Sequence, residues 1–178
     1  ALAFQVPFGV GQAAAIRVGY FYGARDPLGV ARAGWVALAI GTGFMSLTAG
    51  AMVLFPEMLL TIYVDPYAPA NAALVAFALQ YLVLAAIFQL ADGVQAVAAG
   101  ALRGLQDTRV PMWIAIFSYW VPGIGMSVGL GFFTPLEGTG VWIGLATGLF
   151  FAAGLLIWRW YRREALGLTL RSSMPESF

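Results

Sequence analysis

Four long stretches of this chain contain no Asp, Glu, Lys or Arg. They cover residues 33–56, 66–91, 110–136 and 138–158, and each is long enough for the roughly 20 residues that a helix needs to cross a membrane. A fifth apolar stretch covers residues 1–16. Only 10% of the 178 residues are charged, against about 25% in soluble domains, so too few polar side chains remain to surround these stretches in water. We therefore predict an all-α integral membrane protein, a bundle of about five transmembrane helices.

The expected helices cover residues 1–22, 29–54, 73–102, 110–132 and 139–161. Pro7 and Pro122 lie inside two of them, where a missing backbone donor predicts kinks. Glycines also recur at four-residue spacing, which predicts close helix contacts because lipid supplies no hydrophobic drive between helices. These glycines are Gly19 with Gly23, Gly125 with Gly129, and Gly140 with Gly144 and Gly148.

The basic residues are distributed unevenly between the loops. If consecutive helices alternate in direction, all nine of them lie on one side of the membrane: Arg17, Arg25, Arg32, Arg103, Arg109, Arg159, Arg162, Arg163 and Arg171. The opposite loops contain Glu57, Asp65 and Glu137 instead. Because short basic loops resist translocation, this asymmetry predicts that the arginine side and the carboxyl terminus are cytoplasmic. The first helix then enters from outside, and since the chain begins without Met in an apolar run, we expect an earlier helix upstream.

The residues that most enzymes use as acids, bases or nucleophiles are scarce. The chain has no Cys and no His, and its nine basic residues are all Arg, so the usual general bases, Schiff-base lysines and thiol chemistry are missing. We therefore predict that the protein is not an enzyme and needs no cofactor.

One acidic residue interrupts an expected helix. Asp92 lies eleven positions before Arg103 at the cytoplasmic end, or roughly 16 Å along a helix, near the middle of a hydrocarbon layer about 30 Å thick. A carboxylate at that depth costs about 2.5 to 3.5 kcal/mol, so it must face the bundle interior or water. Removal from water disfavours its charged form, which makes Asp92 a candidate proton or cation site. A simple hydrogen bond to a neighbouring helix is the alternative.

Other polar residues accompany Asp92 at membrane depth. Gln89 and Gln95 lie three residues to either side of it, which predicts a polar stripe on one helix face. Gln12 and Tyr119 belong to the first and fourth expected helices. These four residues are candidate cavity-lining groups, and for Gln12 and Tyr119 hydrogen bonding between helices is the alternative.

Several motifs resemble the carboxy-terminal lobe of the MATE multidrug efflux transporters. The sequences VPFGVGQA at residues 6–13, RVG at 17–19 and GARD at 23–26 resemble that lobe's second helix and the loop after it. The sequences QLADGVQ at residues 89–95, GALRG at 100–104 and DTRVP at 107–111 resemble its fourth helix and the cytoplasmic loop that follows. The similarity continues through Tyr119, Trp120 and the glycine-rich residues 138–148.

The resemblance implies helices eight to twelve of a two-lobe, twelve-helix transporter. Residues 1–163 would form a partial carboxy-terminal lobe, residues 164–178 a cytoplasmic tail, and the amino-terminal lobe would be the partner from the same polypeptide. The implied function is multidrug export of cationic or amphiphilic compounds by secondary active antiport, driven by H⁺ or Na⁺ across a plasma membrane, the inner membrane in a bacterium. Asp92 matches the acidic position of the cation site in sodium-coupled members, and no metal other than Na⁺ is expected there. A second acidic residue of that site stands on helix seven, which this chain lacks.

The charged residues at the cytoplasmic end have a plainer interpretation. We expect two loop-stabilising charge networks, one of Arg17 with Asp26 and one of Arg103 with Asp107 and Arg109.

Two other functions remain open. A lipid-linked oligosaccharide flippase of the same superfamily is disfavoured because no arginine lies at midplane. A membrane assembly subunit without transport activity would use Asp92 only to pair helices.

Overall fold

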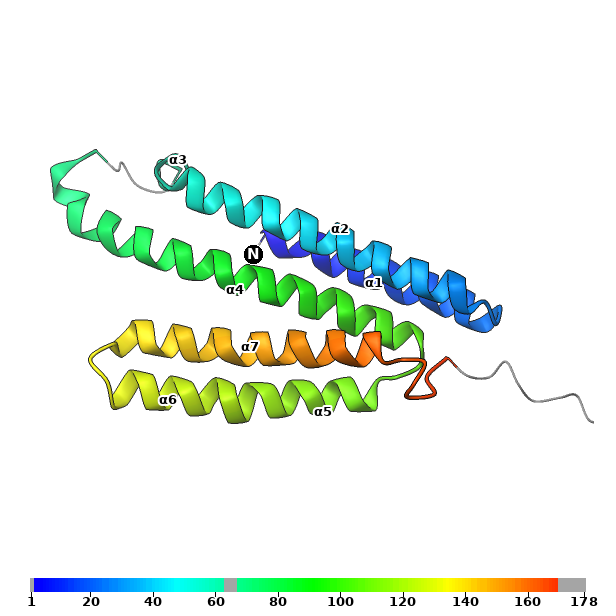
Figure 1. The fold of residues 1–178 in the computed structure, drawn as a ribbon. Coiled ribbons are helices and arrows are strands. Elements are labelled where there is room, and N and C mark those ends of the chain that lie inside the picture. Colours follow the sequence, from blue (N-terminus) through cyan, green and yellow to red (C-terminus); the bar gives the residue numbers. More distant parts are fainter. Residues whose placement is uncertain (1, 63–66, 170–178) are drawn as a thin grey trace, which may run out of the picture.

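A computed structural model describes residues 2–62 and 67–169, which contain helices and no strands (Figure 1). The long helices are α1 (Leu2–Gly23), α2 (Pro27–Leu54), α4 (Ala72–Gly104), α5 (Arg109–Ser118), α6 (Gly125–Phe132) and α7 (Glu137–Tyr161). Short α3 (Pro56–Leu60) and a 3₁₀ turn η1 (Pro69–Asn71) lie between α2 and α4, and a π-helix η2 (Tyr119–Ile124) joins α5 to α6. The five predicted helices are confirmed, with α5, η2 and α6 together making the fourth. Asp65 and Arg171 lie outside the described residues.

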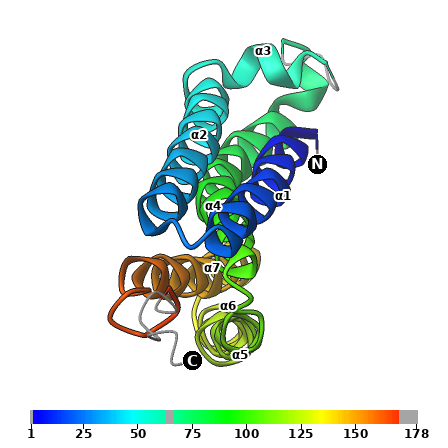
Figure 2. The ribbon, with the colours of Figure 1, turned by 90° about the vertical axis from the view of Figure 1, so that its right-hand side faces the viewer.

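Helix α4 lies between two groups of helices. It packs against α1 and α2 on one side and against α7 on the other (Figure 2). Helix α7 in turn packs along α5, η2 and α6. Any group on the central part of α4 is therefore close to helices from both halves of the bundle.

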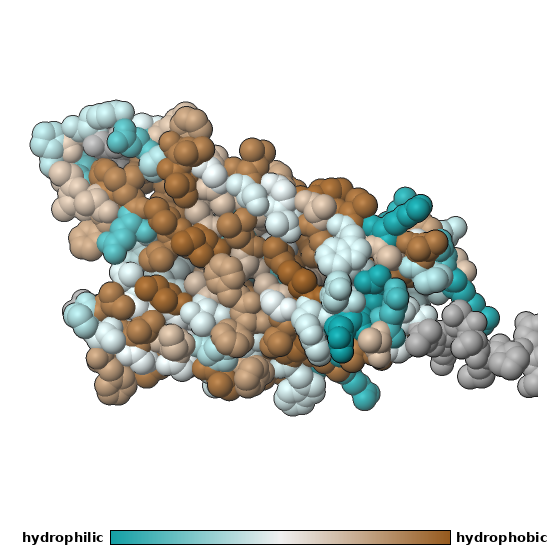
Figure 3. All heavy atoms as spheres, viewed as in Figure 1, coloured by the Kyte–Doolittle hydropathy of each residue, from teal (hydrophilic) through white to brown (hydrophobic). Residues whose placement is uncertain are grey.

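The outer surface of the bundle is strongly apolar. Large side chains such as Leu47, Phe132 and Phe133 are more than two-thirds exposed, and the hydrophobic colour covers the middle of the molecule in Figure 3. Within the described part of the chain, four helical segments are long and apolar enough to cross a membrane: Pro27–Leu54, Pro69–Gly104, Arg109–Phe132 and Gly138–Tyr161. Helix α1 is long enough, at 22 residues, but Gln5, Gln12 and Arg17 lower its hydropathy.

The arginine-bearing ends of the helices meet at one end of the bundle. The turn between α1 and α2, the loop between α4 and α5, and the end of α7 all lie at the right of Figure 1. Hydrophilic residues gather at the same end in Figure 3. The described arginines lie in these connections or in the helical turns next to them: Arg17, Arg25, Arg32, Arg103, Arg109, Arg159, Arg162 and Arg163. Clustering of the described basic residues at one end agrees with the prediction.

Local sequence explains where the helices begin and change form. Asp26 caps α2, since its Oδ1 accepts a hydrogen bond from Gly29 N at 2.9 Å and Pro27 occupies the first turn. Pro122, which has no N–H to donate, lies inside η2, where the wider turn accommodates it. Pro7 is buried inside α1 without interrupting it.

Close packing at glycines was predicted at some positions and not at others. On α7, a Cβ at Gly140, Gly144 or Gly148 would lie within 2.8 Å of backbone atoms of the α5–η2–α6 rod, so this set is confirmed. The set Gly125 with Gly129 is wrong as a contact stripe, because a Cβ at either would meet nothing within 4 Å. Gly23 is equally open. Gly100 was not predicted as a contact glycine. A Cβ there would lie 2.2 Å from Gly11 O, so the glycine lets α4 approach α1.

Candidate functional site

Asp92 lies on the middle of α4, beside a polar cavity between α1, α4 and η2. The cavity has a volume of about 280 Å³. Its polar lining residues are Gln12 from α1, Asp92, Gln95 and Arg103 from α4, and Tyr119 from η2. The side chain of Asp92 is half-buried, and among the described residues it makes no hydrogen bond or ion pair. Its carboxylate is therefore available to a cation or a proton.

A side-chain hydrogen bond crosses this cavity from α4 to the π-helix. Gln95 Nε2 donates to the hydroxyl oxygen of Tyr119, the first residue of η2. The amide oxygen of Gln95 is buried and has no partner among the described atoms. This contact orients two of the predicted cavity-lining residues relative to each other.

Gln89 lies outside the Asp92 cavity. Its Nε2 donates to Thr48 Oγ1 at 2.5 Å, and Thr48 Oγ1 in turn lies 3.1 Å from Met45 O, to which it donates. Gln89 therefore ties α4 to α2 and does not line the Asp92 cavity. The expectation of one polar stripe that includes Gln89 is wrong, whereas Gln12, Gln95 and Tyr119 do lie together with Asp92.

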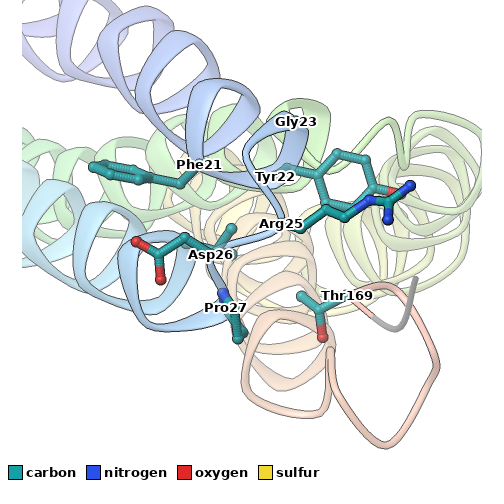
Figure 4. Close-up of a pocket in the computed structure, with 8 residues that line it drawn as sticks. Phe21, Tyr22, Gly23, Arg25, Asp26, Pro27 and Thr169 are labelled. Atoms are coloured by element: carbon teal, nitrogen blue, oxygen red, sulfur yellow. The ribbon is translucent and has the colours of Figure 1, made fainter. Parts of the chain in front are cut away.

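The predicted pairing of Arg17 with Asp26 is absent from the described structure. Asp26 instead caps α2, and the Arg17 guanidinium lies over the Phe21 ring, 5.8 Å from its centroid. Figure 4 shows the Asp26 carboxylate on one side of the α1–α2 turn and the Arg25 side chain on the other. A cavity of about 200 Å³ is lined by this turn and by Thr169 beyond α7. The turn is thus organised by a helix cap.

The second predicted charge network contains different residues from those expected. Asp107 pairs with Arg159 of α7, with Nε and Oδ2 2.5 Å apart. Arg103 and Arg109 form no ion pair among the described residues. Arg103 lines the Asp92 cavity, and with Asp107 it lines a neighbouring cavity of about 240 Å³. Arg159 was not predicted as a member of this network, although its place on the arginine side was a signal that could have suggested it.

Comparison with protein families identifies the chain. The family model described as MatE matches residues 1–128. The chain belongs to the MatE family. Two curated relatives extend the match. The probable multidrug resistance protein NorM of Mesorhizobium japonicum is 49% identical over 165 residues, which are 93% of this chain and 35% of that protein. The multidrug resistance protein NorM of Burkholderia vietnamiensis is 48% identical over 166 residues, 92% of this chain and 36% of that protein.

A solved structure has the same fold as this MatE chain. The crystal structure of the eukaryotic MATE transporter AtDTX14 matches with a TM-score of 0.78 and 21% sequence identity, over 95% of this chain and 38% of that chain. The MatE chain thus spans about a third of the length of the curated relatives it matches. At this level of identity the structural match establishes the arrangement of the helices.

In the part of the MatE chain that the structure describes, the acidic residues do not form a multidentate site of their own. Within residues 2–62 and 67–169, no three His, Cys, Asp or Glu side chains lie together as metal ligands do. Of the cavity-lining residues, Asp92 is the acidic one, and the neutral oxygens nearby belong to Gln12, Gln95 and Tyr119. A weakly held monovalent cation or a proton suits this donor set better than a transition metal, which prefers nitrogen and sulfur ligands.

Proposed function

We propose that this chain forms part of the carboxy-terminal lobe of a two-lobe secondary active exporter. Its substrates would be cationic or amphiphilic drugs, and inward flow of H⁺ or Na⁺ would drive their export across a bacterial inner membrane. The proposal rests on one observation above all: more than nine-tenths of the chain aligns with proteins named multidrug resistance protein NorM at 48–49% identity.

The Asp92 cavity supports this proposal on physical grounds. A carboxylate inside a membrane helix is costly and is retained where it has a function. Asp92 borders an open cavity and has no pairing arginine or lysine among the described residues, so a cation or a proton can neutralise it. Gln12, Gln95 and Tyr119 add neutral oxygens around the same space, and oxygen ligands suit Na⁺. We assign Asp92 as the ion-coupling residue and the other three as lining residues.

The arginine distribution supports an orientation for this assembly. The described arginines gather at one end of the bundle, so we place that end, with residues 164–178, in the cytoplasm. Asp92 then lies about 16 Å above Arg103 in the direction of the outer face. An ion that reaches Asp92 and leaves towards Arg103 would move inward through the lobe.

The flippase alternative is not favoured. A pyrophosphate-binding cavity needs arginines at the depth of the substrate, because bidentate guanidinium pairs bind phosphates most strongly. The arginine that lines the Asp92 cavity is Arg103, eleven residues away from Asp92 and towards the end of α4. At the depth of Asp92 the lining charge is acidic, which suits a cation.

Transport by the complete protein in proteoliposomes tests the proposal. The protein would be reconstituted with ethidium as substrate, under an imposed H⁺ gradient and separately under an imposed Na⁺ gradient. We expect ethidium movement against its own gradient under at least one of the two ions, and none without an ion gradient. Absence of ion-driven ethidium transport, with transport of a fluorescent lipid-linked sugar instead, would overturn the assignment.

A further inference from the structure

A second cavity, on the opposite face of α1 from the Asp92 site, combines apolar walls with two arginines. It is a groove of about 410 Å³ between α1 and α2. Its walls include Val10 and Ala13 of α1 and Val36 and Ile40 of α2, and Arg17 and Arg32 also line it. Val36 and Ile40 are each 56% exposed, so the groove opens onto the outer surface of the described bundle.

The two arginines lie at the same end of this groove. Helices α1 and α2 are antiparallel neighbours, and Arg17 is seven residues beyond Val10 while Arg32 is eight residues before Ile40. At 1.5 Å per residue, the apolar walls extend roughly 11 Å from the arginines towards the middle of the bundle. The groove is therefore amphipathic along its length, with charge at the loop end and hydrocarbon at the other.

The guanidinium groups of Arg17 and Arg32 have no carboxylate partner among the described residues. The acidic group on the adjoining turn is Asp26, and its Oδ1 accepts from Gly29 N at the start of α2. Arg17 does contact the Phe21 ring, at 5.8 Å from the centroid, and this contact leaves the guanidinium edge and its N–H groups available. Two positive charges thus flank the groove, and no carboxylate in the described part of the chain neutralises them.

The depth of the arginines matches the boundary of a bilayer. Helix α2 has 28 residues, or about 42 Å, so about 6 Å at each end extends beyond a 30 Å hydrocarbon layer when the helix is centred. Arg32 lies five residues after Pro27, roughly 8 Å from the helix start. Its side chain can extend from there to the headgroup level.

We propose that this groove binds an anionic phospholipid of the cytoplasmic leaflet, with its phosphate between Arg17 and Arg32 and an acyl chain along Val10, Val36 and Ile40. Charge complementarity selects this occupant, because two guanidinium groups without a carboxylate partner among the described residues repel a cationic drug and attract a phosphate. The lipid would contact both α1 and α2 and hold them together at the end where a single turn connects them. This binding does not depend on transport.

Lipid titration of the complete protein by native mass spectrometry tests the site. The probes are palmitoyl-oleoyl phosphatidylglycerol and the phosphatidylcholine with the same acyl chains. Each basic residue near a membrane surface strengthens binding of an anionic lipid about fivefold. We therefore expect the variant with both Arg17→Gln and Arg32→Gln to bind the first phosphatidylglycerol about 25-fold more weakly, with phosphatidylcholine binding unchanged.

Two further variants separate the groove from general surface charge. Arg109→Gln with Arg162→Gln removes the same two charges from exposed positions at the same end, and should leave phosphatidylglycerol binding within about twofold. Ala13→Phe keeps both groove arginines but fills the apolar part of the groove with a larger side chain. It should therefore weaken phosphatidylglycerol binding. Equal losses in the two arginine pairs would overturn the proposal, as would an unaffected Ala13→Phe variant. The proposal would also be overturned if the unmodified protein showed no preference for phosphatidylglycerol. This is the result expected if another helix covers the groove.

Discussion

Arg159 Nε donates to Asp107 Oδ2 at 2.5 Å, across 52 positions of sequence. The two side chains are 14% and 8% exposed, so the pair is largely removed from solvent. It fixes the loop before α5 to the last turn of α7, at the end of the bundle where the basic residues gather. An ion pair in such a place is far more sensitive to loss of one partner than to loss of both.

Removal of one partner of this pair should destabilise the lobe strongly. Asp107→Asn or Arg159→Gln alone leaves an uncompensated buried charge, at a cost of about 3–5 kcal/mol. The double variant leaves two neutral groups and should recover much of that loss. Thermal unfolding in detergent, followed by tryptophan fluorescence, measures the order of stability of the single and double variants. A double variant no more stable than either single variant would show that the pair is not coupled.

Replacement of Gly34 should disturb the contact between α2 and α7. A Cβ at Gly34 would lie 1.9 Å from Cζ2 of Trp160, a side chain with no exposed area. We expect Gly34→Ala to cost about 1–3 kcal/mol through overpacking. Gly43→Ala, on the same helix with nothing within 4 Å, is the matched control and should stabilise slightly. The penalty at Gly34 should shrink in a Trp160→Leu background, and an undiminished penalty would contradict this origin.

Cysteine labelling should report opposite sides of the membrane for the two ends of the bundle. The chain contains no cysteine, so single reporters within it are unambiguous. Glu57 and Arg162 are both exposed and lie beyond α2 and α7 respectively. We expect Glu57→Cys to react with an impermeant maleimide added outside intact cells, and Arg162→Cys to react only after permeabilisation. Labelling of both from one side would contradict the orientation.

Loss of the hydrogen bond from Gln95 to Tyr119 should reduce transport while leaving the protein folded. Tyr119→Phe keeps the ring but removes the acceptor, at a cost of about 0.5–1.5 kcal/mol for a typical hydrogen bond. We expect a threefold to tenfold loss of ethidium efflux, roughly as that energy implies. Tyr81→Phe is the control, since Tyr81 lies on α4, the helix that carries Gln95, and packs edge-on against Trp142, with ring centroids 6.3 Å apart. Equal efflux in both variants would exclude a role for the contact.

The helices were predictable because each long uncharged run has one stable conformation in a membrane, where every backbone polar group must be bonded within its own segment. The rotation of each helix about its axis was not predictable in the same way. Gln89 and Gln95 are six residues apart, which separates them by about 120° around α4, so Gln89 contacts α2 and Gln95 contacts η2. The pairing of Asp107 with Arg159 likewise depends on how α7 packs, which no local pattern specifies.

The central proposal is that the charge state of Asp92 couples ion flow to drug export. A coupled group must change its charge during the cycle, and that change must favour one arrangement of the lobes over another. Ethidium efflux by Asp92→Asn and Asp92→Glu forms of the complete protein, at matched membrane expression, measures this most directly. Asn has nearly the same shape and still hydrogen-bonds but cannot change charge, so we expect normal folding with ion-dependent efflux abolished. Glu should retain partial efflux. Normal ion-coupled efflux by the Asn variant, with Glu the more damaging change, would contradict the proposal and assign Asp92 to helix pairing alone.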